Sequence, residues 1–373
     1  MKRFLSAIII LVLVLSLAAC ANTSSQEKVE TTTASESLSS SDVGEFQTQL
    51  EEILKEEKFR GVVRVSKNGV ILCEAANETL SPDSSEEITI DSQFAIGSVS
   101  KQFTAACIML LKEEGKLNVD DTIDKWYPDY QYAKDITVKN LLTMCSGIPD
   151  YVNDANLWEL ASQRYDFSKT ASEEENRKVS RDVILSQELE FTPDSDYAYS
   201  NSNYFLLAEI VEQVSQKSFS DYLKENFLIP LQMTDTGVAE ELSGSGRLVP
   251  NLGEENDIQT KGLCFGDGGI ISTAADMDRW MTSLREHTVL SEDSVNEMTT
   301  DYSPQSGHYG YGLFISSDGA WWHAGAVDSY LTHMYTVPAE GYNLFASTNK
   351  MDLDKMNTVT LRIKQMTIWD DTD

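Results

Sequence analysis

The chain has 373 residues, of which 41% are hydrophobic and 24% are charged. These values are typical of a globular protein with one large domain or two modest ones, and they exclude a disulfide-stapled mini-protein, a coiled coil and a multi-span membrane protein. The 60 acidic and 29 basic residues give a formal net charge of −31. That charge argues against nucleic-acid binding, which needs a basic surface.

The first twenty residues have the features of a secretory signal. Lys2 and Arg3 precede an apolar run that ends in Leu-Ala-Ala-Cys20, and this order is typical of signal peptides. The four-residue ending resembles the lipobox of bacterial lipoproteins, which implies a signal peptide over 1–19, lipidation of Cys20 and a membrane-anchored protein facing outside the cytoplasm. An uncleaved signal anchor is the alternative, and it gives the same location.

Residues 20–43 are rich in Ser, Thr and Glu and almost free of apolar side chains. Such a composition predicts a disordered tether. The remaining residues, 44–373, are predicted to form the folded domain.

The other cysteines are Cys73, Cys107, Cys145 and Cys264, which are widely spaced and lie among apolar or small neighbours. Their even number leaves disulfides open, but the neighbours favour buried free thiols. With four histidines and no HExxH motif, neither a metal nor another cofactor is expected.

The predicted elements start with a helix that ends near Lys58, because Phe46, Leu50 and Leu54 recur at helical spacing. Two β-rich runs, 61–67 and 70–73, flank Asn68-Gly69 and predict a hairpin. Candidate helices follow near 99–114, 137–144, 179–188, 202–216 and 219–226. Strands are expected at 309–315, 330–337 and 342–347, and a closing helix at about 353–368.

Strands at both ends and helices in the centre predict an α+β fold, with a mostly helical region inserted between the halves of one antiparallel sheet. The sheet region covers about 44–97 and 265–373, and the helical region about 98–264. Alternating βα units are not found, which argues against a lipoprotein of the solute-binding class.

The spacing Ser-x-x-Lys occurs three times, at 25–28, 98–101 and 347–350. Only the second occurrence opens a predicted apolar helix, where Ser98 and Lys101 share a face. The preceding Gly97 permits a tight turn, and the Ser98 amide would be a free donor of the first helical turn. A serine needs a base to become nucleophilic, and a buried lysine can supply it.

Two later segments carry further candidate side chains. Tyr199-Ser-Asn201 lies between an acidic loop and a predicted helix, and His323-Ala-Gly325 opens a late β-region. The missing side chain of Gly325 would let a substrate backbone approach a strand closely. Tyr151-Val-Asn153 has the same spacing as Tyr199-Ser-Asn201, but its loop context makes Tyr199 the preferred candidate.

In order and context, these three motifs resemble the signature of the serine β-lactamase-like family, in the branch of class C β-lactamases, D-alanyl-D-alanine carboxypeptidases, D-aminopeptidases and esterases. The resemblance covers about residues 44–350. It implies an antiparallel sheet flanked by helices, built from both chain ends, with the active site beside an inserted helical domain. Further similar segments are 94–104, 115–121, 141–149 and 268–276.

The resemblance implies that Ser98 is the acylated nucleophile and that Lys101 takes its proton or holds a proton network. Tyr199 would act as base in acylation and as proton donor to the leaving group. Which group is the general base stays open.

The resemblance also implies substrate-binding roles. Asn201 would bind the substrate amide or Lys101, His323 and Gly325 would line the strand side, and the amides of Ser98 and Ala326 would form an oxyanion hole. Many relatives have Lys-Thr-Gly at the third motif. A histidine is charged only near or below its pKa, so recognition of a substrate carboxylate is weakened here.

The sequence thus predicts a lipid-anchored serine hydrolase acting on amides or esters, with peptidoglycan-type D-amino-acid peptides, β-lactams and small esters all open as substrates. The alternative is a penicillin-binding-like sensor that becomes acylated without turnover.

Overall fold

The computed structural model describes residues 40–166, 173–242, 245–253, 264–303 and 306–367. The predicted signal peptide, Cys20 and most of the predicted tether lie outside these residues. Helix α1 (Ser40–Glu56) includes residues 40–43, which were predicted to belong to the tether. The helix begins nearly two turns before Phe46, the first of its residues that packs on the core. Within the described ranges, no helix combines the length and apolar character needed to cross a membrane.

A six-stranded antiparallel sheet forms the centre of the molecule, in the order β2-β1-β9-β8-β7-β6. The strands are β1 (Gly61–Lys67), β2 (Val70–Asn77), β6 (Phe314–Ile315), β7 (Trp321–Val327), β8 (Tyr330–Val337) and β9 (Tyr342–Thr348). Asn68 and Gly69 both have positive φ, +50° and +77°, as the tightest hairpin turns require. Because β1 pairs with β9, the two chain ends share one sheet.

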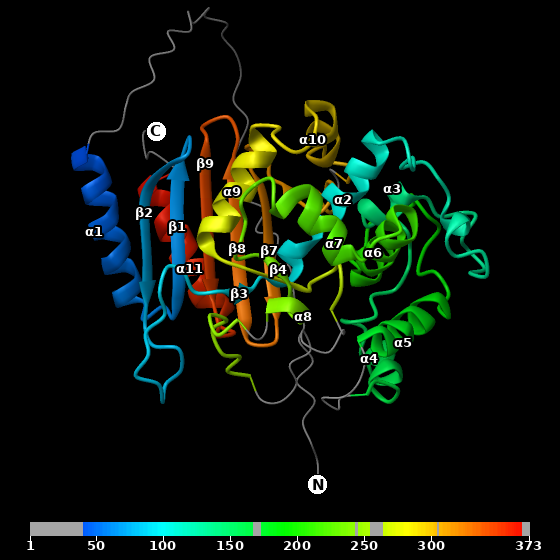
Figure 1. Ribbon diagram of the computed structural model, residues 1–373, viewed down its shortest axis with the longest axis horizontal. Coiled ribbons are helices and arrows are strands. Elements are labelled where there is room, and N and C mark those ends of the chain that lie inside the picture. The colour runs from blue at the N-terminus through cyan, green and yellow to red at the C-terminus, as the bar shows by residue number, and fades with distance from the viewer. Residues whose placement is uncertain (1–39, 167–172, 243–244, 254–263, 304–305, 368–373) are drawn as a thin grey trace, which may run out of the picture.

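Helices α1 and α11 (Leu353–Thr367) cover one face of this sheet (Figure 1). Alternate residues of β1 divide between two cores: Val63 and Val65 pack with α1 and α11, whereas Val62 belongs to the larger core on the other face. The predicted α+β fold, with an antiparallel sheet flanked by helices and built from both chain ends, is therefore confirmed.

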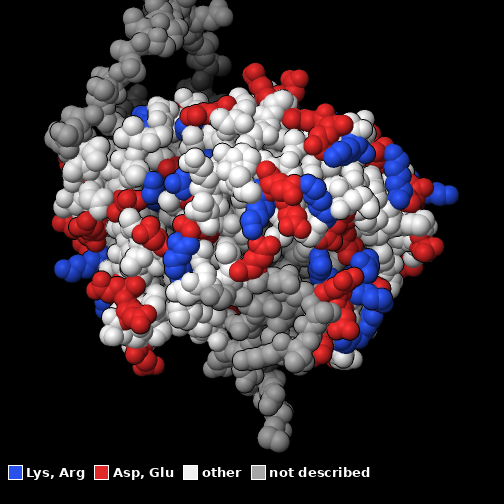
Figure 2. Space-filling view, viewed as in Figure 1, with Lys and Arg blue, Asp and Glu red and all other residues white. Residues whose placement is uncertain are grey.

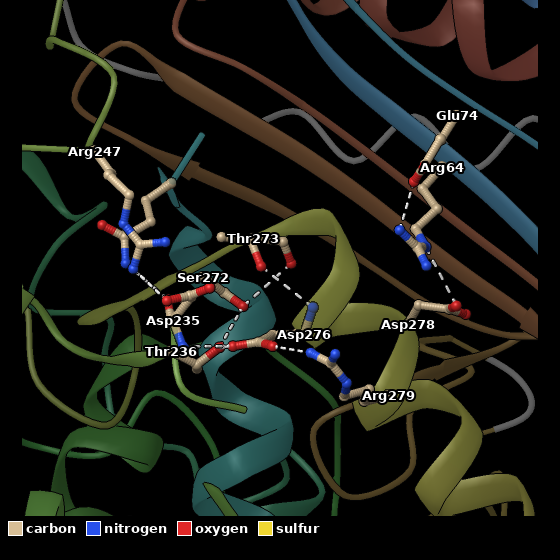
Figure 3. Close-up of polar contacts among 11 residues, drawn as sticks. Arg64, Glu74, Asp235, Thr236, Arg247, Ser272, Thr273, Asp276, Asp278 and Arg279 are labelled. Atoms are coloured by element: carbon tan, nitrogen blue, oxygen red, sulfur yellow. Dashed lines mark hydrogen bonds and ion pairs between the residues drawn. The ribbon is translucent and has the colours of Figure 1, made fainter. Parts of the chain in front are cut away.

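Helix α9 (Ala274–Arg285) lies on the opposite face, against β1 and β9. Two carboxylates of α9 bond to neighbouring segments (Figure 3): Asp276 to residues 235–236, and Asp278 to the sheet, where Arg64 of β1 is one partner. Asp276 accepts hydrogen bonds from the Asp235 amide, the Thr236 hydroxyl and Arg279, at 2.9, 2.9 and 2.5 Å. Asp278 accepts from β1 and β9, through Ser66 at 2.5 Å and Asn343 at 2.8 Å.

The inserted region is mostly helical and lies to the right of the sheet in Figure 1. Helix α2 is buried on nearly all sides and packs on α6, so it forms the centre of this region. A short second sheet has the order β3-β5-β4. The remaining elements are β3 (Phe94–Ala95), η1 (Gly97–Ser100), α2 (Lys101–Glu113), η2 (Ile123–Lys125), α3 (Val138–Leu142), α4 (Ala155–Ser162), α5 (Glu173–Leu185), α6 (Asn201–Ser215), α7 (Phe219–Leu223), η3 (Lys224–Leu228), β4 (Gly237–Val238), α8 (Ala239–Leu242), β5 (Ile270–Ser272) and α10 (Glu292–Met298).

The predicted strand 309–315 is wrong over most of its length, because only Phe314–Ile315 is a strand. Two glycines explain the difference. A Cβ on Gly310 would lie 2.2 Å from the Met298 carbonyl oxygen, and Gly312 has a φ of +76° with its own Cβ position 2.7 Å from the Lys101 carbonyl oxygen. The segment is thus a turn pressed against α10 and the start of α2.

All four cysteines in the described residues are free. Cys73 and Cys107 are buried, whereas Cys145 and Cys264 are partly buried, so the preference for free thiols holds in the structure. On the face drawn in Figure 2, acidic and basic side chains are interspersed.

Candidate active site

The 3₁₀ helix η1, which carries Ser98, lies directly against β7. Two glycines allow this contact. Gly97 has a φ of +52°, and a Cβ there would lie 2.7 Å from the Ala326 nitrogen; a Cβ on Gly325 would lie 1.9 Å from the Ile96 carbonyl oxygen. The space at Gly325 that we expected for a substrate backbone is therefore taken by the chain's own backbone. The same contact brings Ser98 beside Gly325 and Ala326.

Lys101 is the first residue of α2 and is fully buried. Its Nζ donates to Ser98 Oγ at 3.0 Å, to Asn201 Oδ1 at 2.7 Å and to the Asp267 carbonyl oxygen at 2.6 Å. Ser98 itself is partly exposed, so a molecule in solution can reach it. Burial lowers the pKa of Lys101 to about 8, although the negative charges of Asp267 and Asp150 oppose this shift.

The three bonds of Lys101 differ in kind. The Asn201 and Asp267 oxygens are carbonyl oxygens and can only accept, whereas the Ser98 hydroxyl can accept or donate. An ammonium would donate to all three. A neutral amine would keep its two N–H groups on the carbonyls and direct its lone pair at the Ser98 hydroxyl. The site therefore accommodates both protonation states without moving a heavy atom.

Tyr199 lies immediately before α6, with its ring centroid 5.0 Å from Lys101 Nζ. Among the described residues, its buried hydroxyl has no hydrogen-bond partner. Burial raises the pKa of Tyr199 far above its ordinary value, and the neighbouring Ser98 hydroxyl offsets part of the rise. A neutral phenol is therefore favoured. Its unpaired hydroxyl is the kind of feature that functional sites retain at a cost in stability.

His323 on β7 is only 1% exposed. Its Nδ1 lies 2.6 Å from the Ala324 carbonyl oxygen, which can only accept, so Nδ1 carries the proton. Nε2 then accepts from the Tyr309 hydroxyl at 3.1 Å. Burial, reinforced by the positive charge of Lys101, lowers the pKa of His323 to about 3. The ring is therefore neutral at physiological pH, with both nitrogens bonded inside the protein.

Two carboxyl groups at this site were not identified from the sequence. Asp267 is buried, and its side chain accepts from the Tyr151 hydroxyl at 3.0 Å and the Phe265 amide at 2.8 Å. Asp150 accepts from Asn201 Nδ2 at 3.1 and 2.9 Å. Their partners lie far away in sequence, so local spacing gives no signal for them.

The alternative pair Tyr151 and Asn153 occupies other positions. The Tyr151 hydroxyl contacts the far side of Asp267, and Asn153 is exposed. Of the other two Ser-x-x-Lys occurrences, 25–28 lies outside the described residues. In the third, Ser347 is buried within the sheet and bonds Thr332 at 2.8 Å.

The structure thus brings Ser98, Lys101, Tyr199 and Asn201 together on one side and β7 on the other. This arrangement offers a reachable hydroxyl, a buried amine that can take or give a proton, and a neutral phenol. The part of the chain that the structure describes holds no group of three or more His, Cys, Asp or Glu side chains arranged to bind a metal.

Comparison with known proteins identifies relatives in sequence and in fold. The family model described as Beta-lactamase matches residues 46–365. Penicillin-binding protein 4* of Bacillus subtilis (strain 168) is 27% identical over 295 residues, which cover 73% of this chain. Protein flp of Staphylococcus aureus (strain COL) is 24% identical over 331 residues, which cover 81% of this chain. The matched part spans 63% of the length of each relative.

Solved structures share the fold. The D-amino acid amidase of Ochrobactrum anthropi SV3, complexed with L-phenylalanine amide, superposes with a TM-score of 0.70 at 22% identity, over 87% of this chain and 98% of that protein. A penicillin-binding protein of Bacillus halodurans gives a TM-score of 0.72 at 22% identity, over 84% of this chain and 99% of that protein.

Proposed function

Because this chain belongs to the beta-lactamase family, we propose that it is a serine hydrolase that forms an acyl-enzyme on Ser98. The observation that carries this proposal is the fully buried Lys101, whose Nζ lies 3.0 Å from the hydroxyl of a reachable serine. The N-terminal sequence supports a lipid anchor on Cys20 and a location outside the cytoplasm.

In the proposed acylation, the neutral Lys101 amine takes the Ser98 proton as the serine oxygen bonds to the substrate carbonyl carbon. The resulting ammonium keeps both carbonyl acceptors at 2.7 and 2.6 Å. We assign the base role to Lys101 rather than Tyr199, because burial favours the neutral phenol. The Tyr199 hydroxyl then delivers a proton to the leaving nitrogen or oxygen, and Lys101 restores it.

The developing oxyanion needs donors on the other side of the carbonyl. The amides of Ser98 and Ala326 are our candidates, because η1 and β7 are in backbone contact at these residues. Asn201 would hold Lys101 rather than the substrate, since both ends of its amide are occupied.

The neutral His323 bears on the substrate class. A fixed positive charge would bind a substrate carboxylate, but this ring is uncharged and bonded to Tyr309 and Ala324. We therefore propose esters and amides without a carboxylate beside the scissile bond. Acyl-D-Ala-D-Ala peptides and β-lactams carry that carboxylate and should react more slowly.

The test is turnover by the full chain and by Ser98→Ala, with p-nitrophenyl acetate, D-phenylalanine amide, benzylpenicillin and an acyl-D-Ala-D-Ala peptide. We expect the wild type to hydrolyse the ester or the amide, and Ser98→Ala to lose about 10³-fold or more in rate. Full activity in Ser98→Ala would overturn the proposal. A stable adduct on Ser98 without product release would instead support the sensor.

A further inference from the structure

We infer that Asp150 is a positioning residue, which fixes the orientation of the Asn201 amide and thereby the hydrogen bonding of Lys101. The effect of Asp150 on hydrolysis rests on the function proposed above, whereas the orientation of the Asn201 amide is inferred from contacts alone. Asp150 follows Pro149 in the loop after α3, and its side chain is partly exposed.

Among the described residues, the Asp150 side chain acts as the acceptor in each of its hydrogen bonds. Oδ1 accepts from the amides of Val152 and Asn153 at 2.9 and 3.2 Å, and Oδ2 accepts from Asn153 Nδ2 at 2.7 Å. Both oxygens also accept from Asn201 Nδ2, at 3.1 and 2.9 Å. This set of donors suits a carboxylate, which only accepts, and an amide in its place would direct an NH₂ group at donors.

Asn201 lies between two groups that cannot exchange roles. The Lys101 Nζ, as an ammonium, only donates, and the Asp150 carboxylate only accepts. One amide orientation satisfies both. Rotation by 180° would place the Asn201 NH₂ against Lys101 and its oxygen against the carboxylate, which would lose both bonds and create two repulsive contacts.

The orientation matters because, among the described residues, Asn201 Oδ1 is one of two carbonyl oxygens that accept from Lys101 Nζ. If the amide turned, an NH₂ dipole would face the ammonium and favour the neutral amine. A substitution of Asp150 leaves the other neighbours of Lys101 unchanged, both the groups whose charge acts on it and those whose rings lie beside it. They are Asp267, Cys264, Tyr199, Tyr204 and His323.

Glu190 provides a control for a nearby charge that does not contact Asn201. It is exposed, and its pKa is raised by burial and by the neighbouring charges of Asp154 and Asp150. In the described part of the chain, the hydrogen bonds of the Asn201 side chain go to Lys101 and Asp150. Glu190→Gln therefore removes a nearby negative charge and leaves the Asn201 amide in place. The charge of Asp150 also acts on Lys101 directly, so Asp150→Asn is also made in the Asn201→Ala background, where only that direct effect is left.

The experiment is an NMR titration of the Lys101 side chain in the full chain labelled with ¹⁵N,¹³C-lysine, with Lys101→Arg to assign the signal. We expect Asp150→Asn to lower the titration midpoint by about one pH unit or more, and Glu190→Gln by less than about 0.3 unit. Asp150→Ser, which also removes the carboxylate, should shift it in the same direction if the first variant does not fold. The inference would be overturned if Asp150→Asn shifted the midpoint equally in the wild-type and Asn201→Ala backgrounds, or did not shift it in the wild type, because a direct charge effect does not need the Asn201 amide.

A second readout separates this inference from the proposed function. The rate at which a fluorophosphonate labels Ser98 is followed against pH in the same proteins. In Asp150→Asn we expect the midpoint of this profile to move to lower pH with the NMR midpoint, and the limiting rate to fall about 10-fold. If the wild type is not labelled while the NMR shift occurs, the proposed hydrolase fails and the positioning role stands. Labelling without an NMR difference leaves the hydrolase intact and refutes the positioning role.

Discussion

Two polar clusters of this molecule surround a buried ionisable side chain in different ways. At the base of α9, Asp276 is surrounded by the donors Thr236, Arg279 and the Asp235 amide, and each of its oxygens has a fixed partner (Figure 3). Around Lys101 one partner, Ser98, can reverse its hydrogen bond, and the adjacent Tyr199 hydroxyl is unpaired among the described residues.

The difference separates a structural cluster from a reactive one. A buried carboxylate whose two oxygens accept from donors on two segments stabilises one conformation. A buried amine with two fixed acceptors and one reversible partner can change its protonation while its neighbours stay in place. We therefore propose that the Asp276 cluster contributes stability and that the Lys101 cluster carries the chemistry.

The largest expected effect is that of Lys101→Met. Removing the amine should lower the rate of Ser98 labelling by about 10³-fold, since the serine loses its proton acceptor. Stability should change by less than about 2 kcal/mol, because the desolvated amine is removed but Asn201 Oδ1 and the Asp267 carbonyl oxygen lose their donor. Labelling kinetics and urea unfolding measure the two effects. Activity within about 10-fold of the wild type would assign the base role elsewhere.

Asp276→Ala should lower stability and leave the labelling of Ser98 unchanged. It leaves the Asp235 amide and Thr236 hydroxyl without their acceptor, and we expect a loss of about 3 kcal/mol in the free energy of unfolding. The labelling rate per folded molecule should be unchanged. If the labelling rate per folded molecule fell without a loss of stability, Asp276 would take part in the chemistry, and the assignment of separate roles to the two clusters would be wrong.

Tyr199→Phe removes a hydroxyl that has no partner in the described residues. Hydrolysis should therefore fall about 10²-fold through loss of proton delivery, while the free energy of unfolding changes by less than about 0.5 kcal/mol or increases. The matched control is Tyr204→Phe, whose hydroxyl donates to the Leu142 carbonyl at 2.8 Å. Tyr204→Phe should lower the free energy of unfolding. An equal decrease in Tyr199→Phe would contradict the claim that the Tyr199 hydroxyl is unpaired.

The smallest expected effect is a pH dependence. If the neutral amine of Lys101 is the base, the labelling rate should rise with pH and level off above about 8. The contribution of Lys101 to stability, measured as the difference between the wild type and Lys101→Met, should follow in the same direction. The folded-state pKa, about 8, lies below the ordinary value of 10.5, so between these values the unfolded chain holds a Lys101 proton that the native state has lost, and this contribution to the free energy of unfolding rises with pH. The buried thiols of Cys73 and Cys107, whose pKa values burial raises, act in the opposite direction in both proteins and cancel in the difference. A labelling rate that falls across this range would require the ammonium instead.

The sequence identified the elements that have clear local patterns. Asn68-Gly69 predicted the hairpin, and the strand 330–337 was predicted with the bounds that the structure gives. The motifs at Ser98, Tyr199 and His323 lie on three separate parts of the fold, and their resemblance to a known family, rather than spacing, indicated that they converge.

What could not be predicted depends on contacts between distant residues. Helix α9 was missed, because its buried face includes Asp276 and Asp278. These acidic residues interrupt the helical spacing of apolar residues from which a helix is predicted. The turn at 309–313 was mistaken for a strand, since nothing local shows that Gly312 must fit against Lys101. The backbone carbonyl of Asp267 was not identified as a lysine acceptor, because its partner lies 166 residues away.

The most direct test of the central claim is time-resolved intact-mass spectrometry of the full chain mixed with p-nitrophenyl acetate, alongside Ser98→Ala and Lys101→Met. The account predicts that an acetyl adduct forms on the wild type and decays as product accumulates. It predicts no adduct on Ser98→Ala, and formation on Lys101→Met that is slower by about 10³-fold. The claim that Lys101 activates Ser98 would be contradicted if the adduct formed at equal rates on the wild type and Lys101→Met. It would also be contradicted if an adduct formed on Ser98→Ala.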